Sequence, residues 1–327
     1  MTTLRITPPR NALISYHYLQ KFDVSKLAGL NLIGDSGAFS AKTQGATIDV
    51  NALCDWSIKW KDYLVWTAAL DVIGDPVGTH RNWLLMRGRG VNAVPTIHFP
   101  AKPTELDDYA KDGVTFLGLG GQVGGNQKAL LRWVVSVMRY ARDKYPDMRF
   151  HGWGATGALS NLLPYYSVDS TSWASSFMFG RLELRDPRSM DKRFKFKLDG
   201  KEAFKPEIAN LLSSFYGVSP SVIARSHKDN AEEIIELSAL SASVWQDRLR
   251  KKHGVITVPP DLKHTPLGDG PHLHLANGRI KALMHLAKFA RSGGWTTDAP
   301  SEKKDGIIVD TTTTERGQNP CALSQEP

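Results

Sequence analysis

Three aspartates in this chain of 327 residues each follow an apolar, strand-like stretch and are the only acid of that stretch: Asp35, Asp71 and Asp169. Each one taken alone could be a turn residue or a helix cap. In a parallel α/β sheet or barrel, however, the carboxyl ends of the strands meet at one face, and substrates bind there. Isolated carboxylates are costly to bury unless they are paired or hydrogen-bonded. We therefore expect the three to share one pocket.

Glycine and aromatic residues accompany these acids at the strand ends. Glycine lets a flat ligand approach backbone N–H and C=O groups, and an aromatic ring can stack on such a ligand. Two carboxyl groups with separate roles can cleave a glycosidic bond, one attacking the sugar carbon while the other protonates the leaving group. A flat slot with two such acids suits a bond between a sugar and a nucleobase. The residues concerned are Gly37, Gly120, Gly121, Gly152 and Gly154 with Phe39, His151 and Trp153.

Strand-like and helix-like segments alternate along the first half of the chain. Helices are expected at 49–63 and 127–144, and Pro95 is expected to disturb the fourth strand. Such alternation is typical of a parallel sheet, and eight rounds close a barrel. We therefore predict an α/β fold of the (β/α)8 TIM-like barrel type, with Phe177–Phe179 or Phe194–Phe196 as the eighth strand. The seven clearer strands are expected at 13–18, 30–34, 65–70, 91–97, 114–117, 149–154 and around 165–173.

The character of the sequence changes after about residue 200. Helices are expected at 206–216, 230–252 and 277–291, with a proline-rich loop at 259–271. From residue 296 the chain is polar and without periodicity, which is typical of disorder. The predicted organisation is a barrel at 1–200, a helical, basic extension at 201–295 that binds nucleic acid, and a disordered tail at 296–327.

Positive charge is concentrated in one segment. The chain has a formal net charge of +8, and residues 181–205 hold nine Lys and Arg against five acids. Such a segment either is a solvated basic face or contacts a polyanion such as nucleic acid. The candidate nucleic-acid-binding residues are Arg181, Arg185, Arg188, Lys192, Arg193, Lys195 and Lys197.

Composition excludes several classes of protein. The only cysteines, Cys54 and Cys321, cannot build a disulfide framework or a cysteine zinc site, which favours a reducing cytoplasm. No apolar run is long enough to span a membrane, and no signal peptide is expected. The glycines at 118–124 have the wrong spacing for a dinucleotide fingerprint, and His272-Leu273-His274 lacks a carboxylate cluster for a metal. We predict neither cofactor nor metal.

The ordered motifs between about residues 30 and 175 resemble those of the tRNA-guanine transglycosylase superfamily. The closest resemblance is to its phage and bacterial DNA-modifying branch, which places 7-deazaguanine bases in DNA. Asp35-Ser36-Gly37-Ala38-Phe39 is similar to that family's Asp-Ser-Gly-Gly-aromatic segment, which implies that Asp35 is the general acid/base and that Phe39 stacks on the base. Val168-Asp169 is similar to the family's Phe-Asp pair, which implies that Asp169 is the nucleophile.

The same resemblance implies the residues that recognise the base. Asp71 matches the base-recognising aspartate, and Gly120-Gly121 matches the glycine pair whose following backbone contacts the base. His151-Gly152-Trp153-Gly154 resembles the glycine-rich segment of the sixth strand, with His151 at a stacking position. His98 stands where the family has a glutamine, so recognition at that edge of the base differs here.

The chain also departs from the tRNA enzymes, because it lacks the cysteines of their zinc subdomain. That subdomain helps to hold tRNA, so its absence favours DNA as the partner and a free 7-deazaguanine base as co-substrate. Exchange on tRNA, or a non-catalytic barrel that only binds nucleic acid, are the alternatives. A barrel lyase or aldolase would need a lysine at a strand end, and none of the seven supplies one. The expected location is the cytoplasm, that of the host if a phage encodes the protein.

Overall fold

The centre of the molecule is a sheet of nine strands that pair only in parallel. The computed structural model describes residues 6, 9–121, 126–155, 157–189, 192–198, 201–224, 231–276, 280–292, 303–304 and 307–308. The strand order is β4-β3-β2-β1-β11-β8-β7-β6-β5. The strands are β1 (Asn11–Ser15), β2 (Asn31–Asp35), β3 (Leu64–Ala68), β4 (Ala93–Val94), β5 (Thr96–His98), β6 (Phe116–Gly120), β7 (Arg149–Gly152), β8 (Ser167–Ser170) and β11 (His272–Ala276).

The two ends of this strand order are joined by the chain itself. Strands β4 and β5 are separated only by Pro95; β4 pairs with β3, and β5 pairs with β6. Proline has no N–H to donate, but its carbonyl accepts a hydrogen bond from the N–H of Gly118 at 2.8 Å. The sheet is therefore a nearly closed parallel barrel, and Pro95 interrupts the fourth predicted strand as expected.

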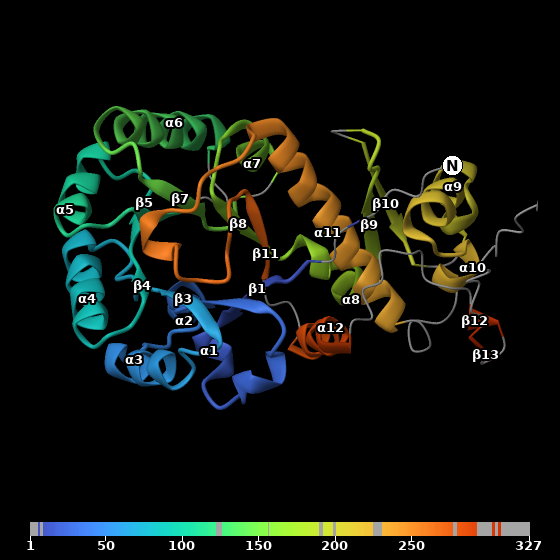
Figure 1. Ribbon diagram of the computed structural model, residues 1–327, viewed down its shortest axis with the longest axis horizontal. Helices are drawn as coiled ribbons and strands as arrows, with labels where there is room; N and C mark the ends of the chain where they lie inside the picture. Colours follow the sequence, from blue (N-terminus) through green and yellow to red (C-terminus); the bar gives the residue numbers. More distant parts are fainter. Residues whose placement is uncertain are drawn as a thin grey trace, which may run out of the picture.

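Helices cover the outside of this sheet (Figure 1). Helix α6 shows why: Leu130, Trp133, Val134, Val137 and Ala141 recur at helical spacing and are all buried against the strands. It occupies the predicted residues 127–144. The helices are α1 (Tyr16–Leu19), α2 (Ala38–Thr43), α3 (Val50–Lys59), α4 (Pro76–Gly88), α5 (Leu106–Lys111), α6 (Gln127–Lys144), α7 (Ala158–Leu162), α8 (Ser175–Phe179), α11 (Ala231–His253) and α12 (Ile280–Ser292), with short 3-10 turns η1 (Val24–Leu27), η2 (Pro103–Glu105) and η3 (Ser172–Ala174).

Residues 254–271 close the amino end of the barrel. They include the 3-10 turn η6 (Pro260–Leu262), and Leu262 and Leu267 join the buried cluster inside the strands. Asp261 accepts hydrogen bonds from the backbone N–H groups of Thr115 and Phe116, at 2.8 and 3.0 Å. The loop expected at 259–271 is thus anchored to the strand ends.

The strand that completes the sheet is β11, which lies between β1 and β8. Both predictions for an eighth strand were wrong: Phe177–Phe179 belongs to α8, and Phe194–Phe196 belongs to a separate hairpin. Strand β11 contains two histidines, so its sequence does not look like a buried strand, although all five of its residues are buried. The predicted helical extension at 201–295 therefore contributes a strand to the sheet, and residue 200 is not a boundary of the sheet.

A second, smaller core lies beside the barrel, along α11 (Figure 1). Its apolar side chains include Leu182, Leu184 and Phe196 from an antiparallel hairpin, with Ile234 and Val244 from α11. We call residues 181–224 the insert. Its elements are β9 (Arg181–Arg185), β10 (Arg193–Lys197), η4 (Glu202–Phe204), α9 (Pro206–Leu211), the π-helical turn η5 (Leu212–Tyr216) and α10 (Pro220–Ile223).

Little of the C-terminal segment belongs to the described structure. Within the predicted disordered tail at 296–327, only β12 (Lys303–Lys304) and β13 (Ile307–Ile308) are described, and they pair antiparallel. The rest of that prediction lies outside the described residues. No helix in the described part of the chain is both long and apolar enough to cross a bilayer.

Candidate active site

A cavity of about 1310 Å³ opens at the carboxyl ends of the strands. We call it the carboxyl-end cavity. Eight of the nine strands contribute their last residue or the one that follows it, so the barrel itself positions the lining. These residues are Ser15, Asp35, Ala68, His98, Gly120, Trp153, Ser170 and Ala276.

Asp35, Asp71 and Asp169 all line this cavity, as the sequence predicts. Removal from water, and to a smaller extent the negative charges of Asp169 and Asp71, raise the pKa of Asp35 to about 6, although a hydrogen bond from the backbone at Gly37 opposes the shift. Charges act strongly on each other only at short range in a protein. The electrostatics therefore agree with the geometry that these acids form one group.

Asp169 is held by groups from the neighbouring strand. It is buried in β8, and its Oδ1 atom accepts a hydrogen bond from the backbone N–H of Gly154 at 2.6 Å. The Nε2 atom of His151 lies 3.5 Å from the same oxygen. Asp169 therefore caps no helix, and its carboxylate faces the cavity with one oxygen fixed.

Asp71 and His98 form a pair across the cavity wall. Their Oδ2 and Nε2 atoms are 3.2 Å apart, while the Oδ1 atom of Asp71 is buried without a hydrogen-bond partner. Burial by itself lowers the pKa of His98, but the hydrogen bond and the charge of Asp71 outweigh it and raise the pKa. A methyl group at Gly120 would overlap the imidazole of His98, which explains glycine at the end of β6. The pair presents both an acceptor and a donor.

His151 does not occupy the predicted stacking position. It is fully buried beneath Asp169 and is absent from the cavity lining, because Trp153 covers it with ring centroids 4.4 Å apart. Trp153 lines the cavity and donates from Nε1 to Thr96 Oγ1 at 3.0 Å. Gly118 makes room for this indole, since a methyl group there would overlap it. The aromatic surface at this point is therefore Trp153.

Exposed apolar side chains surround the entrance. Phe39 on α2 is 72% exposed although it is a large aromatic residue. Five other exposed apolar residues line the same cavity: Tyr18, Val72, Ile73, Val77 and Phe99. Exposed apolar patches of this kind mark binding sites. Phe39 thus lies exposed in the lining of this cavity, and its stacking on a base stays a prediction.

The wall of the carboxyl-end cavity is acidic. Among the described residues that line it, none is Lys or Arg. A phosphate would be repelled from such a surface, so a bound ligand presents neutral or donor groups here. The lining acids are Asp35, Asp71, Asp75, Glu105, Asp108 and Asp169.

The predicted basic residues lie instead on and beside the β9–β10 hairpin. The register puts Arg181, Arg185, Arg193, Lys195 and Lys197 on one face with Glu183. We call this the basic face. The opposite face buries Leu182, Leu184 and Phe196 in the second core.

Three of the predicted basic residues contact groups of the insert or of α11. The Arg185 guanidinium packs 4.4 Å from the ring of Trp245 on α11, and burial lowers its pKa to about 10. Arg188 is held by two hydrogen bonds to the carboxylate of Asp186, each of 2.8 Å. Lys192 lies within 3.6 Å of Glu207. The side chains of Arg193, Lys195 and Lys197 lie at the surface, where Arg193 and Lys195 also pair with Glu183 at 3.6 and 3.0 Å.

Sequence reasoning missed two histidines of the barrel interior as part of this region. His274 pairs in register with Asp169, and His272 pairs with Ser167. The alternation of His and Leu over 272–275 is the period-two signal that could have found them. Thr96, which anchors Trp153, was likewise not predicted.

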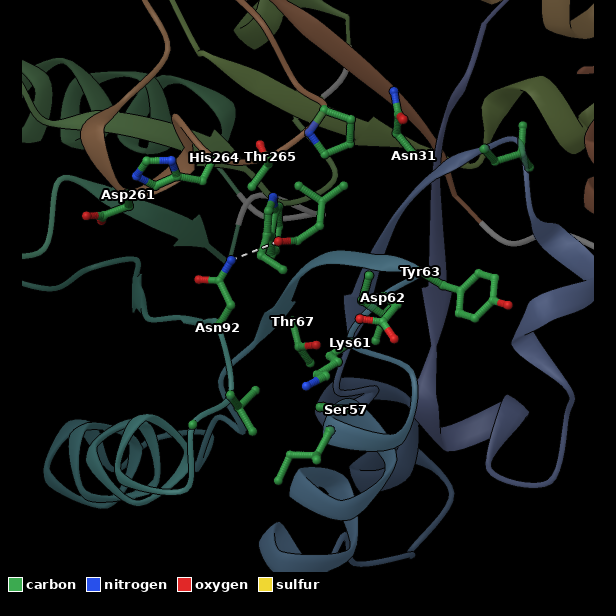
Figure 2. Close-up of a pocket in the computed structure, with 18 of the residues that line it drawn as sticks. Asn31, Ser57, Lys61, Asp62, Tyr63, Thr67, Asn92, Asp261, His264 and Thr265 are labelled. Atoms are coloured by element: carbon green, nitrogen blue, oxygen red, sulfur yellow. Dashed lines mark hydrogen bonds between the residues drawn. The ribbon is translucent and has the colours of Figure 1, made fainter.

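A second cavity of about 690 Å³ lies at the amino ends of β2 and β3 (Figure 2). Its walls come from the strand starts and from the loop that closes the barrel, for example Asn31, Asn92, Asp261 and His264. Asn92 uses its amide to bind the backbone carbonyl of Val65 at 2.8 Å. None of the predicted site residues lines this amino-end cavity.

The carboxyl-end cavity therefore combines a buried carboxylate held at one oxygen, a carboxyl with a pKa near neutrality and a donor–acceptor pair beside glycine backbone. Such a set can perform nucleophilic displacement with acid/base help on a flat ligand. The backbone after Gly121, implied by the resemblance to contact the base, lies outside the described residues.

Comparison of the chain with models of known families, with curated proteins and with solved structures found no match in any of the three.

Proposed function

We propose that the chain is a guanine transglycosylase that exchanges guanine in DNA for a 7-deazaguanine base. The observation that carries the proposal is the meeting of Asp35, Asp71 and Asp169 in one cavity at the carboxyl ends of the strands. The proposal takes β4 and β5 as one strand of an eight-stranded TIM-like barrel, in which active sites lie at this end.

The proposed chemistry is a double displacement. A carboxylate oxygen of Asp169 attacks C1′ of the target nucleoside, the bond from C1′ to the guanine nitrogen breaks, and Asp35 gives its proton to the departing base. The incoming base then loses a ring N–H proton to Asp35, and its nitrogen displaces Asp169 from C1′. Two inversions give net retention, and Asp35 recovers its proton in the second step.

Recognition of the base is assigned to Asp71 and His98. The unpartnered Oδ1 of Asp71 can accept from the N–H groups of a guanine edge, and protonated His98, whose Nε2–H faces Asp71, can donate from its other ring nitrogen to the carbonyl oxygen of the base. Phe39 and Trp153 supply the faces for stacking. An acidic wall without lysine or arginine fits a neutral base better than a phosphate.

The basic face supports a nucleic-acid partner outside the cavity. Its lysines and arginines match the requirement for phosphate contacts that are independent of sequence. The target nucleotide would leave the base stack to reach Asp169. The proposal therefore separates the polymer contacts on the insert from the chemistry in the barrel.

The experiment is exchange of labelled guanine in duplex DNA and, side by side, in tRNA, with trapping of the covalent adduct. Wild-type protein should exchange guanine in DNA and form an adduct at Asp169. Asp169→Ala should do neither, and Asp35→Ala should keep at most a trace, since acid/base help is worth ~10²–10⁴-fold. Exchange in tRNA alone would move the proposal to that polymer. Salt-sensitive DNA binding without any adduct would favour a non-catalytic barrel.

A further inference from the structure

Beneath Asp169, the barrel interior holds polar groups that an apolar core does not need. His151 and His274 are each 0% exposed, and Trp66 is 1% exposed. The ring centroid of His151 lies 5.2 Å from that of Trp66 and 5.9 Å from that of His274. A buried polar atom without a partner is costly, so a role is expected for the group that touches a site residue.

His151 is fixed at one ring nitrogen and unpartnered at the other. Its Nδ1 atom lies 2.8 Å from Ser167 Oγ, and its Nε2 atom makes no hydrogen bond but lies 3.5 Å from Asp169 Oδ1. A carboxylate oxygen only accepts, so a lone pair on Nε2 would be repelled by it. The arrangement therefore assigns the proton to Nε2, with Ser167 donating its hydroxyl to Nδ1.

We propose that His151 is a positioning residue for the nucleophile Asp169. The Gly154 N–H donates to Oδ1, and the Nε2 atom of His151, which makes no hydrogen bond, lies 3.5 Å from the same oxygen, so Oδ1 is held and Oδ2 is left to attack. The same contacts stop the carboxylate from rotating away from the sugar carbon, and orientation of this kind contributes directly to rate. This inference rests on the proposed function, because it takes Asp169 as the nucleophile.

His274 provides a matched comparison inside the same barrel. It is as deeply buried as His151 and pairs in register with Asp169, yet among the described residues neither of its ring nitrogens makes a hydrogen bond or an ion pair with the Asp169 carboxylate. Burial and the neighbouring histidines hold its pKa well below the usual value. A substitution of His274 therefore disturbs packing at the same depth without removing a donor to Asp169.

The test is the single-turnover rate of adduct formation with an oligonucleotide containing deoxyguanosine. His151→Met keeps volume but removes the N–H that faces Asp169, and it should slow adduct formation ~10–100-fold if that contact shortens to a charge-assisted hydrogen bond when the substrate binds. The oligonucleotide concentration that gives half the maximal rate should not change. His151→Gln restores an N–H donor and should recover most of the rate. His274→Met should react as the wild type does.

Equal rates for the wild type and His151→Met would overturn the inference, as would a loss that His151→Gln does not relieve. If the wild type forms no adduct, the proposed function fails instead, and nitrogen NMR of the free protein still decides the geometry. We expect the Nε2 atom of His151 to carry a proton. An unprotonated Nε2 would overturn the inference whether or not the variants fold.

Discussion

Asp35 shows how one side chain can be poised for two proton transfers. A pKa of about 6 lies close enough to neutrality for the carboxyl to give a proton and later take one back. The shift comes first from burial and then from two further acids of the same cavity. Activity and stability therefore make opposite demands on this residue.

The raised pKa of Asp35 predicts how the free energy of unfolding depends on pH. Because the folded pKa lies above the ordinary value of 3.8, protonated Asp35 stabilises the fold below that value, and the contribution is lost as pH rises through about 6. Asp35→Asn should thus raise the free energy of unfolding at about pH 8 by on the order of 1–3 kcal/mol, with no gain near pH 4. Chemical denaturation of both proteins at the two pH values measures it. An equal effect at both values would contradict it.

The same residue predicts a pH profile for the first half of the reaction. In the proposed mechanism Asp35 must carry its proton to release guanine, so the rate of adduct formation should fall as pH rises through about 6. Single-turnover rates measured with wild-type protein across this range test the expectation. A rate that rises with pH would assign the proton to another group.

At the level of elements, the end of strand β6 decides whether His98 can face Asp71. Gly120→Ala would put a methyl group into the imidazole ring and displace it. We expect KM for the incoming base to rise ~10-fold, the cost of one recognition contact, with a smaller change in kcat. Steady-state exchange kinetics give both constants. Gly88→Ala on α4 is the control, because nothing lies within 4 Å of its Cβ position.

The basic residues of the β9–β10 hairpin are expected to differ in role, some in DNA binding and one in stability, and this difference can be tested. Replacing Lys195 and Lys197 by Gln should weaken DNA binding uniformly and lower the slope of log affinity against log salt by ~1–2. Binding titrations at several salt concentrations measure the slope. Arg185→Met should instead lower stability, because Arg185 packs on Trp245. Lys61→Gln, at the amino-end cavity, should leave both unchanged.

How far the sequence predicts these elements depends on the signal that each carries. Helix α6 has a strong apolar repeat and was predicted at its observed bounds. Strand β11 was missed, because a strand buried on both sides can carry histidines whose partners come only from distant strands. The position of His151 beneath Trp153 could not be predicted from the sequence for the same reason. The indole of Trp153, two residues further along the chain, covers His151 only because Gly118 leaves space for it.

For the whole molecule, the two ends of the barrel have different tasks. All the acids proposed for chemistry line the carboxyl-end cavity, while the amino end is closed by residues 254–271. Asp261→Ala would leave two backbone N–H groups without their acceptor, and we expect it to cost ~1–3 kcal/mol of stability. Exchange kinetics at a temperature where both proteins are folded should not change. A large fall in kcat would show that the ends are coupled.

The insert leaves the barrel after α8 and the chain returns to it through α11, and these two helices are tied by a hydrogen bond between the hydroxyls of Ser176 and Ser238. The departure and return points are therefore neighbours, although more than fifty residues separate them in sequence. Residues 181–224 can therefore be exchanged as one unit without a break in the barrel, as long as the replacement covers the apolar side chains of α11 that the insert now buries, such as Ile234 and Val244.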